Sequence, residues 1–178
     1  MDIRPAVVAD LPEIQAIYAH HVLHGTGSFE EAPPSVEEIT TRFQAATGDG
    51  WSWLVAADAT GVIGYGYYAQ YKNRSAYRFT AEDSVYVRED VRGQGVGKAL
   101  VAALIEQATA QGFRQMVAVI GDSANLASIR LHEKLGFARI GVQPAIGFKL
   151  GRWVDSVLMT RPLGEGPTTA PAERPLRG

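Results

Sequence analysis

The stretch Asp83–Gln111, DSVYVREDVRGQGVGKALVAALIEQATAQ, joins a strand-like segment to a helix-like segment through a glycine-rich turn. The residues at positions 85–87 are types that favour strands. Apolar residues then recur at helical spacing from position 96 to position 108. The three glycines of the turn leave backbone N–H groups uncovered where the helix begins, and such groups bind anions. This stretch therefore predicts a binding loop for an anion, and the anion we expect is a pyrophosphate.

Two other kinds of phosphate loop do not match this turn. A Walker A loop would need a glycine at position 92 and a serine or threonine at position 99, where the chain has Arg92 and Ala99. A dinucleotide fingerprint would need the spacing G-x-G-x-x-G, whereas Gly93, Gly95 and Gly97 follow G-x-G-x-G. A glycine turn that only caps an ordinary helix is the simpler alternative. The turn is therefore best interpreted together with the segments around it.

The composition predicts a globular domain without disulfides. Of the 178 residues, 46% are hydrophobic and 20% are charged, the formal net charge is -2, and cysteine is absent. Because no run of Lys and Arg occurs, we expect neither nucleic acid nor a membrane as a partner. We find no signal peptide and no membrane-spanning run, so we expect a cytoplasmic protein. The lack of cysteine excludes a cysteine acyl-enzyme.

The order of patterns along the chain predicts a mixed α/β (α+β) fold. We expect a strand, two helices, a three-strand antiparallel run, a helix, a strand, a helix and a final hairpin, with one parallel step. The first helix should begin with Asp10 as its N-cap and Glu13 at the capping-box position. Residues 1–163 should form one domain. Residues 164–178, which are rich in Pro and Gly, should form a flexible tail.

Three of the histidines follow one another closely in the first predicted helix. His20, His21 and His24 do not form an H-E-x-x-H pattern, and no carboxylate completes a set of metal ligands. We expect no metal site, and we interpret these histidines as surface or interface residues.

Four segments, in matching order and spacing, resemble the GNAT superfamily of acetyltransferases. They are KNRSAYRFTAEDSVYV, VRGQGVGKAL, MVAVIGDSANLASIRLHEKLGF and GFKLGRWVD. Within that superfamily the chain looks like the phosphinothricin and methionine sulfoximine N-acetyltransferases. The resemblance implies a central mixed twisted sheet flanked by helices, acetyl-CoA as cosubstrate without a metal, and a homodimer. The loop at residues 25–34 departs most from the family and agrees well only at Phe29, which leaves the amine substrate open.

The resemblance also implies the two catalytic residues. Glu82 matches the family's general base, which would take a proton from the amine directly or through one water. A salt bridge between Glu82 and Arg78 or another cation is the structural alternative. Asp83 is a weaker candidate, because in a strand it points to the opposite face. His132 stands where many members carry Tyr in LYEKLGF, and it would protonate the departing thiolate or polarise the thioester. A histidine with only a structural role is the competing interpretation.

The binding residues follow from the same resemblance. The strand edge would hold the pantetheine arm and orient the thioester carbonyl, and the glycine-rich loop would hold the pyrophosphate. The expected cofactor-binding residues are Val85, Tyr86, Val87, Arg92, Gly93, Gln94, Gly95, Val96, Gly97, Lys98, Asn125 and Ser128. The expected substrate-binding residues are Phe29, Lys72, Arg74, Tyr77 and Tyr86. Without the resemblance, the cations between 72 and 78 would be interpreted as a solvated hairpin end. Lys149 and Arg152 are candidates for subunit pairing or for a place beside the substrate.

The function we expect is direct transfer of the acetyl group of acetyl-CoA to the amino group of a small anionic amino-acid analogue. Phosphinothricin, methionine sulfoximine and methionine sulfone are examples. One alternative is an N-acetyltransferase that acts on a protein N-terminus or lysine, although the cations between 72 and 78 would repel a lysine-bearing partner. Another is a non-catalytic acyl-CoA-binding module that regulates a partner.

Overall fold

Seven strands and four helices make up residues 1–172, which the computed structural model describes. The strands are β1 (Asp2–Pro5), β2 (Trp53–Asp58), β3 (Gly61–Gln70), β4 (Thr80–Val87), β5 (Gln115–Gly121), β6 (Ala138–Lys149) and β7 (Arg152–Pro162). The helices are α1 (Leu11–His24), α2 (Val36–Gly48), α3 (Val96–Ala110) and α4 (Leu126–Lys134). Short 3-10 turns lie at η1 (Val8–Asp10), η2 (Ser75–Tyr77), η3 (Glu89–Val91) and η4 (Gly166–Thr168).

The strands form one mixed sheet in the order β1-β2-β3-β4-β5-β7-β6. The pairing of β4 with β5 is parallel, and the other neighbouring strands are antiparallel. Helix α3 crosses between the two parallel strands, as a parallel connection requires. The predicted mixed α/β fold with one parallel step is confirmed.

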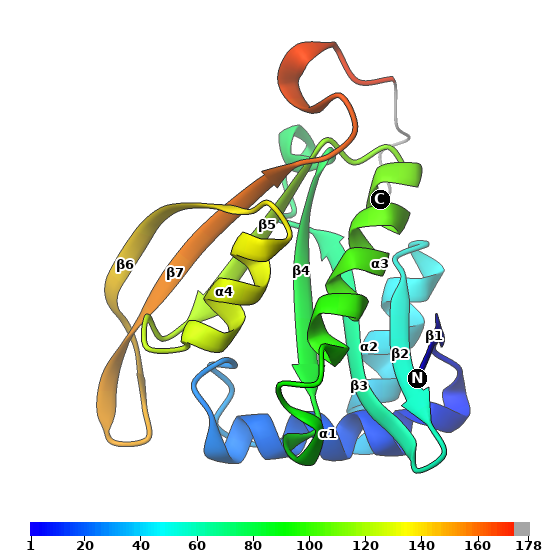
Figure 1. Ribbon diagram of the computed structural model, residues 1–178, viewed down its shortest axis with the longest axis vertical. Helices are drawn as coiled ribbons and strands as arrows, with labels where there is room; N and C mark the ends of the chain where they lie inside the picture. The colour runs from blue at the N-terminus through cyan, green and yellow to red at the C-terminus, as the bar shows by residue number, and fades with distance from the viewer. Residues whose placement is uncertain (173–178) are drawn as a thin grey trace.

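Helices cover both faces of the sheet. In Figure 1, α3 and α4 lie in front of it, and α1 and α2 lie behind it. The larger apolar core lies on the side of α3, where Leu100 and Leu104 pack with strand residues such as Met116. The smaller core lies on the other side, where Ile14 of α1 and Ile39 of α2 pack with apolar strand residues. Because side chains alternate along a strand, each residue of β4 faces only one of these two layers.

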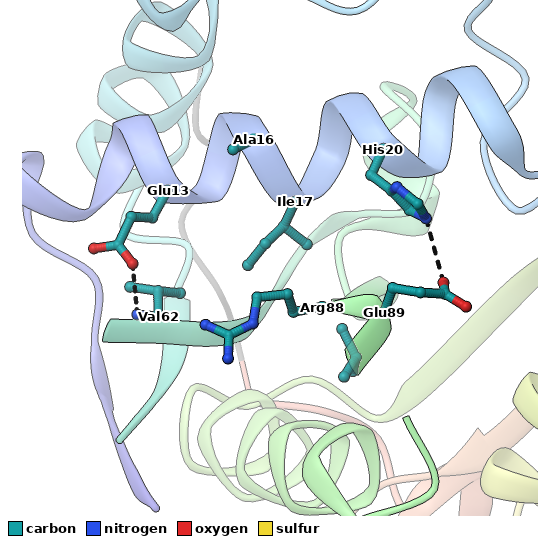
Figure 2. Close-up of a pocket in the computed structure, with 8 residues that line it drawn as sticks. Glu13, Ala16, Ile17, His20, Val62, Arg88 and Glu89 are labelled. Atoms are coloured by element: carbon teal, nitrogen blue, oxygen red, sulfur yellow. Dashed lines mark hydrogen bonds and ion pairs between the residues drawn. The ribbon is translucent and has the colours of Figure 1, made fainter. Parts of the chain in front are cut away.

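The start of α1 differs from the predicted capping box. The Asp10 carboxylate makes no cap of α1, because it accepts from the backbone N–H of Val7 at 2.8 Å and from the guanidinium of Arg4. Glu13 reaches across to β3 and accepts from the backbone N–H of Val62 at 2.8 Å, as Figure 2 shows. Partners distant in sequence thus displace the local bonds. The capping-box prediction was wrong here.

The beginning of the predicted tail makes contacts with the domain. Arg114 donates to the backbone oxygen of Gly166 at 3.0 Å and to that of Thr169 at 2.9 Å. Gly166 is buried, although we expected the tail from residue 164 onward to add nothing to the domain. The remainder of the tail, residues 173–178, lies outside the described residues.

The loop between α1 and α2 is anchored to the far end of the sheet. The ammonium of Lys149, which is buried, donates to the backbone oxygen of Ser28 at 2.6 Å. The ring of Phe29 lies against Gly121 and Gly147, where an added Cβ would come within 2.9 Å and 2.7 Å of ring carbons. A Cβ at Gly121 would also overlap the backbone oxygen of Thr26. Glycine at these positions lets the loop lie directly on the strands.

The substitution Gly121→Ala should therefore destabilise the fold by about 1–3 kcal/mol, the usual cost of overpacking. The matched control is Gly141→Ala, because a Cβ at this strand glycine would meet nothing within 4 Å. Urea unfolding of both variants measures the difference as a shift in midpoint at constant slope. Equal stability of the two variants would show that the loop does not lie on Gly121.

Candidate active site

The parallel strands β4 and β5 separate halfway along their length. They pair only from Thr80 with Gln115 to Asp83 with Ala118. Beyond that point, which we call the fork, β4 stays paired with β3 and β5 stays paired with β7. The backbone groups that face each other across the fork therefore have no partner strand, as at the edge of a sheet. An extended ligand could add to this edge by backbone hydrogen bonds.

The fork opens into a groove of about 720 Å³. This volume is in the range of pockets that hold cofactors and small ligands. The walls are β4, β5, the start of α3, one side of α4 and the start of the loop that follows α1. A smaller cavity of about 230 Å³ lies between α1 and the ends of β3 and β4 (Figure 2). It shares only Val87 with the groove, so the predicted site belongs to the groove.

The glycine-rich loop forms the floor of the groove at the start of α3. Gly93 and Gly95 have φ angles of 78° and 84°, in the left-handed region that favours glycine. Gly95 is the N-cap of α3 and no side chain caps the helix, so the first N–H groups of a 15-residue helix face the groove. A Cβ at Gly93 or Gly95 would meet nothing within 4 Å. This bare helix start fits an anionic group.

Most of the predicted cofactor residues line this groove. The structure brings together Val85, Tyr86, Val87, Arg92, Gly93, Gly95, Val96, Gly97, Lys98, Asn125 and Ser128. Gln94 is exposed and is not part of the lining. Gly97 has a packing role as well, because a Cβ there would lie 2.9 Å from a methyl group of Leu131 in α4. Glycine at this position allows α3 and α4 to approach each other beside the fork.

A polar turn connects β5 to α4 on the opposite wall. Asp122 has a φ angle of 72°, and it accepts from Thr26 at 3.0 Å and from the backbone N–H of Ala124 at 3.0 Å. Arg152 also donates to this carboxylate, so Arg152 supports the turn. Asn125 then caps α4 by accepting from the backbone N–H of Ser128 at 3.3 Å. These bonds fix the position of α4 along the groove.

His132 and Asp83 form a buried pair at the fork. The His132 ring lies between the backbone oxygen of Ser128, 2.8 Å from Nδ1, and Asp83 Oδ2, 3.1 Å from Nε2. The two side chains are 2% and 1% exposed. Burial alone would lower the pKa of His132, but the hydrogen bond and charge of Asp83 raise that pKa above its ordinary value. His132 is therefore held by a buried carboxyl group in the core.

Glu82 lies on the other face of β4, toward α1 and α2. Burial, with a smaller contribution from the charge of Asp83, raises the pKa of its carboxyl to about 6, against the lowering effect of Lys72. Arg78, the alternative partner, donates to the backbone oxygen of Ser75 and lies over the ring of Phe79. A half-buried carboxylate with a pKa near neutrality can accept a proton at physiological pH.

Aromatic side chains pack together on this face of the sheet, beyond Glu82 along β4. Tyr86 stacks on Tyr65, with ring centroids 5.3 Å apart, and meets the edge of Tyr18 at 4.9 Å. Burial raises the pKa of Tyr86 well above its ordinary value, so its hydroxyl stays protonated. Tyr86 is also one of the residues that line the groove.

The other predicted substrate residues lie in two places. Lys72 belongs to an exposed cluster near Glu82, where its ammonium lies 5.0 Å from the ring of Tyr71 and 5.6 Å from that of Tyr77. The backbone oxygen of Arg74 in the same turn accepts from Gln70 at 3.3 Å. Phe29, in contrast, packs at the end of β5 against the two glycines described above, and it is 42% exposed.

His21, which we interpreted from the sequence as a surface or interface histidine, lines the groove. Its Nε2 lies 2.9 Å from the backbone oxygen of Val87 and must donate to it, and its ring lies 5.3 Å from that of Tyr86. Burial lowers the pKa of His21 below its ordinary value. His21 follows the buried residues Ile17 and Tyr18 at helical spacing, which is the signal that could have indicated an inward side chain. Thr26, Arg130 and Lys134 line the groove as well.

The groove is not accompanied by a cluster of metal ligands. Within residues 1–172, no group of three or more His, Cys, Asp or Glu side chains is arranged to hold a metal ion. In the same part of the chain, no helix combines the length and the apolar character needed to cross a membrane.

Comparison with known proteins identifies the family. The family described as "Acetyltransferase (GNAT) domain" matches residues 3–158. The chain belongs to the GNAT acetyltransferase family. The resemblance inferred from the four segments is thereby confirmed, and so is the GNAT fold.

Close relatives of this acetyltransferase have related names. A phosphinothricin N-acetyltransferase of Alcaligenes faecalis is 51% identical over 162 residues, which cover 91% of this chain and 82% of that protein. An L-methionine sulfoximine/L-methionine sulfone acetyltransferase of Pseudomonas paraeruginosa is 47% identical over 158 residues, covering 88% and 91%. The crystal structure of a GNAT superfamily phosphinothricin acetyltransferase from Sinorhizobium meliloti in complex with AcCoA is 50% identical, with a TM-score of 0.93. The two structures match over 97% of this chain and 93% of that one.

The environment of Glu82 predicts a measurable titration in this acetyltransferase. The carboxyl carbon NMR signal of Glu82 should titrate with a pKa of about 6. Lys72→Met should raise that pKa, because it removes the cation that favours the ionised form. Arg74→Met is the control: it removes the same charge from the same turn, but Arg74 does not contribute to the shift. An unchanged pKa in Lys72→Met would place Lys72 away from Glu82.

Proposed function

We propose that this acetyltransferase transfers the acetyl group of acetyl-CoA directly to the amino group of a small amino-acid analogue. Phosphinothricin, methionine sulfoximine and methionine sulfone are the acceptors we propose. The observation that carries the proposal is the fork, which combines open β4 backbone, a bare helix start and a carboxyl with a raised pKa within one site. The names of the relatives support the substrate class.

The groove has the features needed to hold acetyl-CoA in an extended form. The first N–H groups of α3 would bind the pyrophosphate, with Lys98 beside them in the lining. The unpaired edge of β4 from residue 84 onward would hold the pantetheine arm by backbone hydrogen bonds. When bound, acetyl-CoA supplies a thioester, an acyl group that an uncharged amine can attack.

Glu82 would act as the general base. An amine at neutral pH is mostly an ammonium ion, and it cannot attack until it loses a proton. With a pKa of about 6, Glu82 is largely ionised above that pH and can take this proton directly or through one water. Its position is also suitable, because Glu82 and Asp83 are the last residues of β4 that pair with β5 before the strands separate.

The exposed cations near Glu82 would select an anionic acceptor. Lys72 and Arg74 lie in the turn before β4 and could bind the carboxylate and the second polar group of an amino-acid analogue. Tyr77 and Tyr86 would add hydroxyl donors, and Phe29 would cover the site from the anchored loop. The same cations would repel a lysine-bearing protein, which favours the small acceptor over the protein acceptor.

The proposed reaction can be tested by thiol release from acetyl-CoA with these three acceptors. We expect turnover with at least one of them, and Glu82→Gln should reduce kcat by about 10²–10⁴-fold while acetyl-CoA binding persists. The kcat/KM profile of the wild type should fall as pH decreases through about 6, because protonated Glu82 cannot accept a proton. No release with any acceptor at saturating acetyl-CoA would refute the substrate class. Full activity of Glu82→Gln would remove Glu82 from the mechanism.

We also propose that the protein acts as a homodimer in the cytoplasm, the compartment in which it would meet its acetyl donor. The hairpin of β6 and β7 extends beyond the helices in Figure 1, and it carries a group of exposed apolar side chains. They are Ile140, Val142, Ile146, Phe148, Leu150 and Trp153. Exposed apolar patches of this kind favour burial against a partner, and a second copy would cover this one.

The dimer predicts a change of mass when the patch is disrupted. The double substitution of Phe148 and Trp153 by Lys should convert the protein to a monomer in size-exclusion chromatography with light scattering. Leu23→Lys is the control, because Leu23 is also exposed and apolar but lies on α1 outside the hairpin. A monomeric wild type, or a dimeric double variant, would contradict this surface as the interface.

A further inference from the structure

The fork contains one buried carboxylate that the proposed reaction does not yet use. Asp83 is the residue after Glu82, and alternation along β4 directs the two side chains to opposite faces. Asp83 lines the groove together with His132, whereas Glu82 does not. Within residues 1–172, Asp83 Oδ1 is buried and has no hydrogen-bond partner. A carboxylate in such a place is costly unless a cation compensates its charge.

The hydrogen bonds of His132 restrict where its protons can be. The backbone oxygen of Ser128 can only accept, so Nδ1, 2.8 Å away, must carry a hydrogen. Nε2 faces Asp83 Oδ2 at 3.1 Å, and an ionised carboxylate also only accepts. A neutral imidazole has one N–H and cannot satisfy both oxygens. The pair therefore holds an additional proton, either on Nε2 of His132 or on Asp83.

The surroundings of the pair favour the proton on His132. The ring of Phe137 packs edge-on at 4.9 Å, and the Ser128 hydroxyl lies 3.5 Å from Nδ1. Asp83 favours the imidazolium ion by its hydrogen bond and its charge. The raised pKa of His132 agrees with this arrangement. The buried ion pair compensates the charge of Asp83 without a further donor.

We propose that Asp83 is a positioning residue that keeps His132 as an imidazolium ion at the fork, ready to give a proton to the leaving sulfur. This proposal rests on the acetyl transfer proposed above. As the carbon–sulfur bond breaks, its electron pair goes to sulfur, and the proton of His132 Nε2 forms the S–H bond. His132 is left neutral, with its Nδ1–H still donating to the backbone oxygen of Ser128, and Asp83 remains ionised. A proton from water restores the pair.

The pair is first tested in the free protein, by nitrogen NMR of labelled histidine rings. The chain has four histidines, so single substitutions of His20, His21 and His24 assign His132 by elimination without changing the pair. We expect both ring nitrogens of wild-type His132 to be protonated at neutral pH. An unprotonated Nε2 would overturn the proposal, whatever the enzyme does with acetyl-CoA. This readout requires neither turnover nor a variant of the pair.

The second test is Asp83→Asn, which keeps the shape of the side chain and removes its charge. The amide can donate to an unprotonated Nε2, so a merely structural role of the hydrogen bond would survive this change. We expect the pKa of His132 to fall, because the charge that raises it is removed, and the ring to become neutral at neutral pH. Asp58→Asn, the same chemical change at the end of β2, should leave the His132 signals unchanged.

The kinetic result should agree with the spectrum. In Asp83→Asn we expect kcat to fall about 10²-fold or more, with a much smaller change in the KM for acetyl-CoA. Wild-type kcat in Asp83→Asn, or an unchanged His132 spectrum, would show that the charge of Asp83 has no such role. If no acceptor is acetylated by the wild type, the proposed function fails, but the protonation state of His132 is still decided by the spectrum.

Discussion

The backbone groups of β4 and β5 that face each other across the fork have no strand partner, and the proposed active site depends on this gap in the sheet. The gap persists because each strand is fixed by its other neighbour, β4 by β3 and β5 by β7. Leaving backbone groups unpaired inside a protein is unfavourable unless water or a ligand reaches them. The groove provides that access. Acetyl-CoA, in the function we propose, would replace water along the edge of β4.

Side chains along β4 alternate between the two faces of the sheet, so the polar residues of the site lie in two separate layers. Glu82 faces the aromatic layer formed with α1 and α2, where burial raises the pKa of its carboxyl to about 6. Asp83 faces the groove and pairs with His132 of α4. In the mechanism we propose, a base for the incoming amine and an acid for the leaving thiol act at the same carbonyl carbon but must not neutralise each other. Glu82, the proposed base, and Asp83, which holds the proposed acid His132, are directed to opposite faces of β4, so base and acid are kept apart.

Local patterns predicted those parts of the site that are contiguous in the chain. The glycine spacing at 93–97 indicated an anion loop, because left-handed backbone and a bare helix start are properties of a few neighbouring residues. The local prediction was wrong where a side chain bonds to a residue of another segment of the chain. Asp10 bonds to Arg4 instead of capping α1, and Glu13 bonds to Val62 of another element. His21 lies against Tyr86, a contact that depends on how α1 crosses the sheet.

The sequence by itself determined the fold class, the family and the position of the glycine-rich loop at the start of α3, because these depend on residue types at short spacings and on the order of segments. The tertiary structure alone decided the partners of the buried charges. Burial and contacts between elements decide three properties of these residues. They raise the pKa of the Glu82 carboxyl, they pair Asp83 with His132, and they bond Lys149 to the backbone oxygen of Ser28. Desolvation and hydrogen bonding act over a few ångströms in space, and distance along the chain does not determine them.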